Sequence, residues 1–158
     1  MADFLRRLFG GSEPEEPFSE EQLTVLLESL EAKDTYTRVM AAQQLGEARE
    51  TRAVDGLIAA LHTDMLKRFV EQMQARDRPA GYNAMALYSE VARAEADLKS
   101  AAAAALGQIG EAHPQPRERI VAALAAALHE RDYYTTVAVR DALALIDTPE
   151  ARQALGSR

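Results

Sequence analysis

The stretch "RVMAAQQLGEARETRAVDGLIAALHTD", residues 38–64, reads as a small-residue helix, a glycine and a second amphipathic helix. Its first part places Val39, Ala42 and Leu45 at helical spacing on one face. A looser copy, "KSAAAAALGQIGEAHPQPRERIVAALAAALHERD", occupies residues 99–132. One helix pair alone leaves apolar surface exposed, so two copies predict helix pairs that stack on one another.

Individual residues recur between the copies. Leu45-Gly46 corresponds to Leu106-Gly107, and Leu61-His62 corresponds to Leu128-His129. A third correspondence, at an offset of one hundred residues, pairs Val39, Ala42 and Leu45 with Val139, Ala142 and Leu145. Glycine ends helices, so the first helix is expected to stop at Gly46. Alanine at the recurring positions allows neighbouring helices to approach closely.

The chain around the repeats is also helical in pattern. Residues 19–22, Ser-Glu-Glu-Gln, form a capping box, and a leucine stripe follows at helical spacing. No segment shows the alternation of a half-buried strand, so the sequence predicts an all-α fold. We expect a repeat domain over residues 19–158 and a flexible tail over residues 1–18.

The tail carries a short apolar pattern, with Phe4, Leu5, Leu8 and Phe9 on one face of two helical turns. A glycine pair and the acidic linker "SEPEEP" follow it. Two turns are marginal as an isolated helix, so one interpretation is a frayed start or a turn that docks on the chain's own domain. Weak docking to a partner or a membrane surface is the other.

The repeated residues resemble the HEAT repeat in its short bacterial form, the phycobilin-lyase type. That pattern is an Asp, a Val-Arg pair, an Ala pair and Leu-Gly, which correspond here to Asp34, Arg38-Val39 (inverted), Ala41-Ala42 and Leu45-Gly46. Val139-Arg140 keeps the usual order. The resemblance implies an α-α superhelix, a HEAT-like helical repeat stack, and little about chemistry. It also implies an alternative function, a tetrapyrrole (bilin) lyase-like or tetrapyrrole-binding accessory protein.

Residues 65–96 depart from the repeat pattern. One interpretation is an insert of two long antiparallel helices that project beyond the stack as a hairpin, because "DMLKRF" and "EADLKS" contain no turn residues. In the other, these residues are a degenerate repeat that turns at Thr63-Asp64 and again near Asp97. The hairpin is the preferred interpretation.

Composition excludes several classes of protein. The chain has 18 basic and 25 acidic residues, which argues against nucleic-acid binding, since that depends on cations that neutralise phosphates. It has no cysteine, which excludes disulfides and thiolate metal sites. No run reaches the roughly 18 apolar residues of an integral membrane span. We therefore expect a cytoplasmic protein.

No pattern of residues indicates a catalytic site, a metal site or a cofactor. The three histidines, His62, His113 and His129, lack neighbours at ligand spacing, and Glu90, Glu95 and Asp97 suit a solvated helix face. The Met- and aromatic-rich residues of the insert, with two tyrosines in a turn, are instead candidate binding residues. These candidates are Phe69, Met73, Tyr82, Met85, Tyr88, Tyr133 and Tyr134. The expected function is a non-enzymatic interaction scaffold or adaptor that binds a protein partner or forms a homodimer through the insert.

Overall fold

The computed structural model describes residues 17–75 and 83–156, and this part of the chain is helical without a strand. The all-α prediction is confirmed. The helices are α2 (Glu20–Ser29), α3 (Thr35–Glu47), α4 (Val54–Leu61), α5 (Met65–Gln74), α6 (Ala84–Ala112), α7 (Pro114–Ala126), α8 (Tyr133–Ile146) and α9 (Pro149–Gly156). Two short 3-10 helices, Thr51–Ala53 and Ala127–His129, precede α4 and follow α7. The predicted tail lies mostly outside the described residues.

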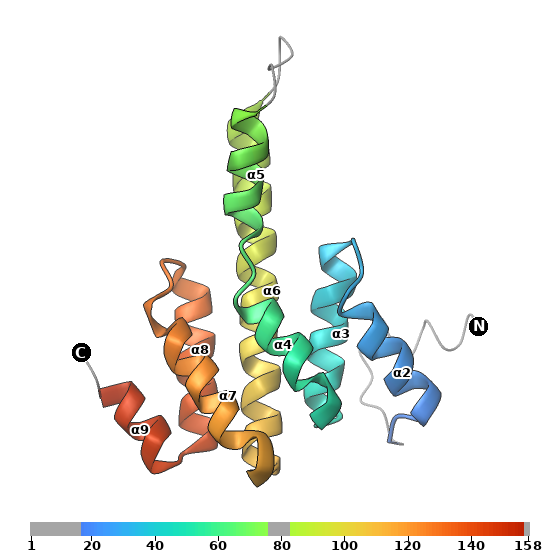
Figure 1. Cartoon of the computed structure of the whole chain (residues 1–158), viewed down its shortest axis with the longest axis vertical. Coiled ribbons are helices and arrows are strands. Elements are labelled where there is room, and N and C mark those ends of the chain that lie inside the picture. Colours follow the sequence, from blue (N-terminus) through green and yellow to red (C-terminus); the bar gives the residue numbers. More distant parts are fainter. Residues whose placement is uncertain (1–16, 76–82, 157–158) are drawn as a thin grey trace.

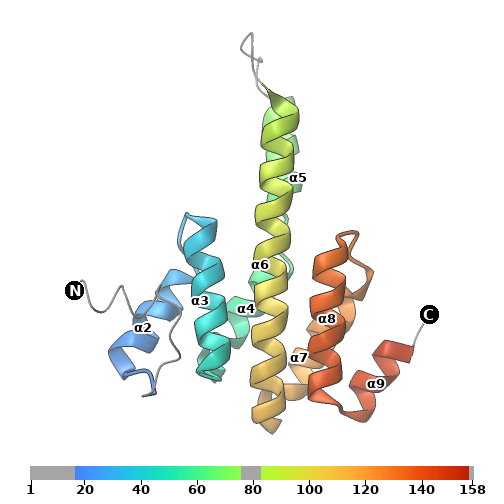
Figure 2. The same ribbon diagram turned by 180° about the vertical axis from the view of Figure 1, so that it is seen from behind.

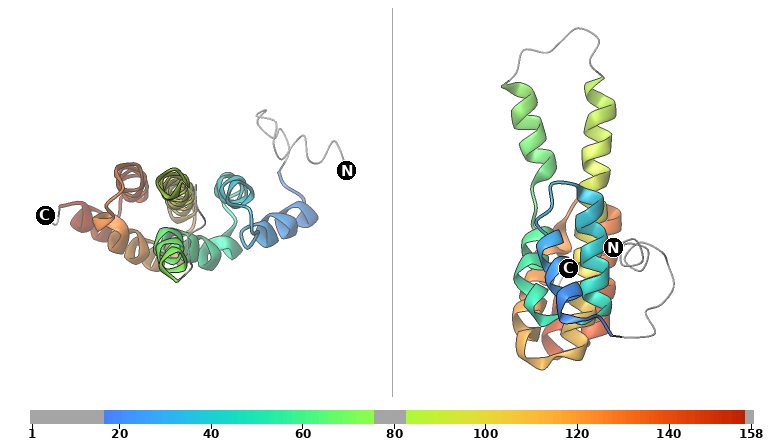
Figure 3. Two further views of the ribbon diagram at one scale, coloured as in Figure 1. Left: turned by 90° about the horizontal axis from the view of Figure 1, so that it is seen from above. Right: turned by 90° about the vertical axis from the view of Figure 1, so that its right-hand side faces the viewer.

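The helices form two layers that follow the order of the sequence (Figures 1 and 3). One layer contains α3, α6 and α8 side by side, and Figure 2 shows this layer from its outer side. The other layer contains α2, α4, α7 and α9. Each pair therefore packs on the pair that precedes it, as a repeat stack requires.

Side chains cap the starts of α2, α3 and α8. Ser19 accepts a hydrogen bond from the Gln22 backbone, and the Gln22 side chain accepts one from the Ser19 backbone, so the capping box is confirmed. Asp34 accepts from the Thr37 backbone at 2.8 Å, and Asp132 accepts from Thr135 at 2.6 Å. Each cap satisfies a backbone N–H that has no partner within its helix.

These caps correct the alignment of the last repeat. The capping residues Asp34 and Asp132 are 98 residues apart. The same distance separates two residues with positive φ, Arg49 (52°) after the end of α3 and Asp147 (51°) after the end of α8. At an offset of 98 the fully buried Leu45 corresponds to Leu143, which is also fully buried. The predicted offset of one hundred is wrong, since it pairs Leu45 with Leu145, which is 50% exposed.

Glycine has a different role from the predicted one. Gly46 does not end α3, which continues to Glu47, and Gly107 lies within α6. A Cβ on Gly46 would lie 2.7 Å from the Cα of Ala105, and a Cβ on Gly107 would lie 2.8 Å from the Cα of Ala142. The two glycines therefore permit close contacts of α6 with α3 and α8.

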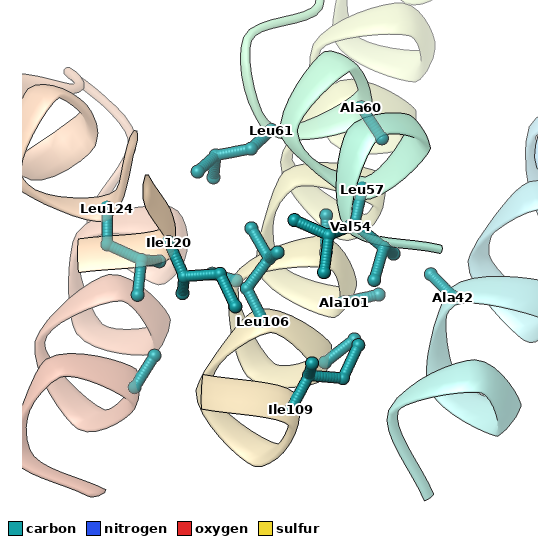
Figure 4. Close-up of a cluster of buried hydrophobic side chains, with 14 of the residues drawn as sticks. Ala42, Val54, Leu57, Ala60, Leu61, Ala101, Leu106, Ile109, Ile120 and Leu124 are labelled. Carbon is teal, nitrogen blue, oxygen red and sulfur yellow. The ribbon is translucent and has the colours of Figure 1, made fainter. Parts of the chain in front are cut away.

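The core lies between the two layers and consists of Leu, Ile, Val and Ala (Figure 4). Leu57 and Leu61 of α4 and Ile120 and Leu124 of α7 are fully buried against α6. Alanines of the recurring positions, such as Ala42, are likewise buried. The small residues face neighbouring helices, as the stacking interpretation expects.

Both interpretations of residues 65–96 are right in part. α6 is one unbroken helix through Asp97, so the turn predicted there is wrong. The first arm is broken, however, because α4 ends at Leu61 and α5 begins at Met65, after a turn at Thr63-Asp64. Figure 1 shows α5 and the first part of α6 projecting together beyond the other helices. We call this projection, residues 65–75 and 83–96, the arm.

Candidate interaction surface

The arm holds most of the predicted binding residues, in two different environments. Phe69 and Met73 lie one turn apart on α5 and are partly buried, and α6 is the helix that packs along α5 (Figure 3). Met85 and Tyr88 on α6 are 73% and 42% exposed. The first two therefore help to join the arm helices, while the second two face solvent. Tyr82 lies outside the described residues.

Tyr133 and Tyr134 begin α8 beside the base of the arm. Their side chains are 74% and 73% exposed, and the rings meet edge to face with centroids 5.8 Å apart. Both rings are exposed, so neither of them fills the turn before α8. Exposed aromatic side chains are frequent anchors in protein interfaces.

A buried polar cluster joins the arm to the stack. The ammonium of Lys99, a residue that is 5% exposed, lies 2.9 Å from Glu95 Oε1 and 3.1 Å from Glu130 Oε1. The other oxygen of Glu95, Oε2, accepts the backbone N–H of Leu66 at 2.7 Å. Three segments thus meet in this cluster: α6, the start of α5 and the turn before α8.

Electrostatics keep this cluster charged. Burial alone lowers the pKa of Lys99, because the charged form loses solvent. Hydrogen bonds and the charges of Glu95 and Glu130 outweigh that effect, so the pKa of Lys99 lies above its ordinary value. The lysine is therefore an ammonium at neutral pH and bridges the two carboxylates.

Glu95 occupies the register position of the capping aspartates. Aligning Leu106 with Leu45 places Glu95 at the position of Asp34, and aligning Leu106 with Leu143 places it at that of Asp132. In α6 the helix continues past this position toward the tip, so no helix start is present for Glu95 to cap. Its carboxylate caps the start of α5 instead. The arm is therefore inserted at the boundary where a new repeat would begin.

Sequence reasoning missed this cluster. Glu95 was assigned to a solvated face, but its side chain is only 15% exposed. The sequence does contain an indication that Glu95 has a capping role, because Asp34, Glu95 and Asp132 occupy the same position in the repeat. It was obscured by the alignment at an offset of one hundred.

The histidines remain at helix ends. The ring of His113 lies 3.0 Å from the carbonyl oxygen of Arg49, while His62 and His129 are exposed. Within residues 17–75 and 83–156, no three His, Asp or Glu side chains are grouped to hold a metal ion. Among the helices described, none has the length and apolarity needed to cross a bilayer.

Comparison with known proteins supports the repeat assignment. A family model described as PBS lyase HEAT-like repeat matches residues 37–63 and 98–130. The first match spans most of α3 with α4, and the second spans the lower part of α6 with α7. The arm lies between the matches, as expected for an insert. The search of curated proteins gives no match.

Proposed function

Because this chain is a HEAT-like repeat protein, we propose that it is a non-catalytic interaction scaffold whose arm contacts a protein partner. The supporting observation is the exposure of Met85 and Tyr88 on a projecting helix, together with the exposure of Tyr133 and Tyr134 at the base of the arm. Exposed aromatic and methionine side chains are enriched in the interfaces between proteins. Methionine and tyrosine adapt well to a protein surface.

The shape of the molecule fits this role. The stack buries its own apolar residues between two layers, so its core needs no partner. The arm has α5 on only one side of α6, and no described residue of α5 is buried. An arm that is fixed to a rigid stack presents its contact residues in one direction, which lowers the entropy lost on binding.

The test uses the full chain and three single substitutions. Tyr88→Glu and Met85→Glu place a charge on the exposed part of the arm, and Glu90→Gln changes an exposed residue on another side of α6. We expect association with protein, whether another chain or a second copy, to be lost in the first two variants and kept in the third. Titration by light scattering and retention on the immobilised chain measure it. Association that survives both charge substitutions would contradict the proposal.

A second candidate is an accessory role with tetrapyrroles. The observation that favours it is the match to repeats named for a PBS lyase. The absence of cysteine leaves no thiol that could hold a thioether intermediate, so binding without a covalent bond is the relevant form. Adding a bilin or a porphyrin and recording its absorption spectrum tests this candidate. An unchanged spectrum at excess protein would remove it.

A further inference from the structure

The side of α6 that packs on α8 continues onto the arm. Gly107 meets Ala142 of α8, and Lys99 reaches Glu130 in the turn before α8. These two contacts identify the side of α6 that faces α8. Positions three or four residues apart lie on one side of a helix, so that side continues toward the tip. Its residues there are Ala96, Ala92, Tyr88 and Met85, which we call the arm face.

α8 reaches only the base of the arm face. It begins at Tyr133, which corresponds in the repeat register to Ala96, so Ala92, Tyr88 and Met85 lie beyond the start of α8 (Figure 2). Met85 lies ten residues before Glu95, a distance of about 15 Å along the helix. The face is thus the extension of an existing helix–helix contact for which the described chain supplies no second helix.

We propose that the arm face pairs with the same face of a second copy, in antiparallel orientation. This inference rests on the proposed function and identifies the partner as a second copy of the chain. The face has two bulky residues toward the tip and two alanines toward the base. In an antiparallel pair whose twofold axis passes near residue 90, each residue lies opposite a residue that is about equally far from 90 on the other side. Met85 of one copy therefore lies opposite Ala96 of the other. For the same reason Tyr88 lies opposite Ala92.

Bulky residues opposite small ones fill such an interface on both sides of its twofold axis. A parallel pairing would place Met85 against Met85 and Ala96 against Ala96. It would crowd the tip and leave space at the base, and poor packing of this kind is costly. The order of residue sizes along the face therefore selects the antiparallel arrangement.

In the antiparallel pair, the exposed tyrosines at the start of α8 also gain a contact with the second copy. The tip half of α6 then reaches the level of Tyr133 and Tyr134, which gives these exposed rings a surface to contact.

The first experiment measures the mass of the full chain by light scattering over a concentration series. We expect the mass to rise from 17.3 kDa toward twice that value. Ala92→Glu buries a charge in the interface and should weaken dimerisation by at least about tenfold. Ala86→Glu is the matched control, because Ala86 lies on another side of the same helix and is exposed. A dimer that resists Ala92→Glu overturns the proposal.

The second experiment tests the orientation through cysteines, which the natural chain lacks. We expect Met85→Cys mixed with Ala96→Cys to form a disulfide-linked heterodimer under mild oxidation, whereas Met85→Cys alone forms little. Efficient linkage of Met85→Cys to itself would overturn the antiparallel pairing. These variants also decide the question if Ala92→Glu fails to fold, which circular dichroism reports.

The failure of this inference and that of the proposed function give different results. A chain that stays monomeric at every concentration overturns the second copy as partner. The proposed function survives that result if a different protein is retained by the chain and lost with Tyr88→Glu. If no association of either kind depends on the arm, both are overturned.

Discussion

Gly46 of α3 and Ala105 of α6 approach so closely that a Cβ on the glycine would lie 2.7 Å from the alanine Cα. Gly107 of α6 stands at the next equivalent position and meets Ala142 of α8 in the same way. The third equivalent position is Ala144, which is exposed, and within residues 17–75 and 83–156 no helix packs on that side of α8 in its layer. Each glycine is thus needed only where a neighbouring helix is present.

Substitution of Gly107 tests this contact. Gly107→Ala places a methyl group against Ala142 backbone atoms that cannot move aside easily, so we expect a loss of about 1–3 kcal/mol in unfolding free energy. Gly156→Ala is the control, since no atom lies within 4 Å of its added Cβ. Urea denaturation measures both. Equal stability of the two variants would show that the layer tolerates wider spacing.

The register of the last repeat predicts a contrast between two nearby leucines. Leu143 is fully buried, so Leu143→Ala should lower the unfolding free energy by about 2–5 kcal/mol. Leu145 is half exposed, and Leu145→Ala should change it by less than about 0.5 kcal/mol. The same denaturation experiment applies to both. A larger loss of unfolding free energy for Leu145→Ala than for Leu143→Ala would instead support the alignment in which Leu45 corresponds to Leu145.

Glu95 should stabilise the start of α5. Glu95→Ala removes the acceptor for the Leu66 N–H and one of the two carboxylates at Lys99, so we expect a loss of about 1–3 kcal/mol. Hydrogen exchange should accelerate in the first turn of α5 more than in α3. Glu90→Ala, at an exposed position on the same helix, serves as the control. Unchanged exchange in α5 would contradict the role of Glu95 as a cap.

Stability should fall in acid because several carboxylates are stabilised in their charged form. The backbone hydrogen bond from Thr37 lowers the pKa of Asp34, and the hydrogen bond from Arg152 lowers the pKa of Asp147. A carboxyl with a lowered pKa binds fewer protons folded than unfolded, so its contribution is present above the unfolded pKa of about 4 and is lost below it. Thermal melting between pH 6 and about pH 2 should show this loss. Asp34→Ala should make the decline shallower.

Local patterns explain how much of the fold could be predicted. The capping box at Ser19 and the apolar spacing in α3 depend on residues within one helix, so the sequence alone indicates them. The close packing at Gly46 depends on Ala105, about sixty residues away, and a glycine read locally indicates a helix end instead. The turn at Thr63-Asp64 contains no glycine or proline, which is why it belonged to the less favoured interpretation of residues 65–96.

The candidate surface could be predicted only as a set of residue types. Methionine and tyrosine in the insert indicated a binding role, but exposure separates Met85 and Tyr88 from Phe69 and Met73. That separation depends on which side of α6 the partner helix α5 occupies. Burial of Lys99 depends on three segments that meet in space, and no single stretch of sequence contains them.

Because α6 is one unbroken helix, the number of residues between Glu95 and Met85 fixes the side of the helix on which Met85 lies. One residue inserted between Met85 and Glu95 would rotate Met85 about 100° around the helix axis and move it outward by about 1.5 Å. Seven inserted residues would return it almost to its original side, about 10 Å higher. The number of residues between Met85 and Glu95 therefore sets the direction in which the arm face points. Insertions there would turn the contact residues toward another side of the molecule, although the contact residues themselves would be unchanged.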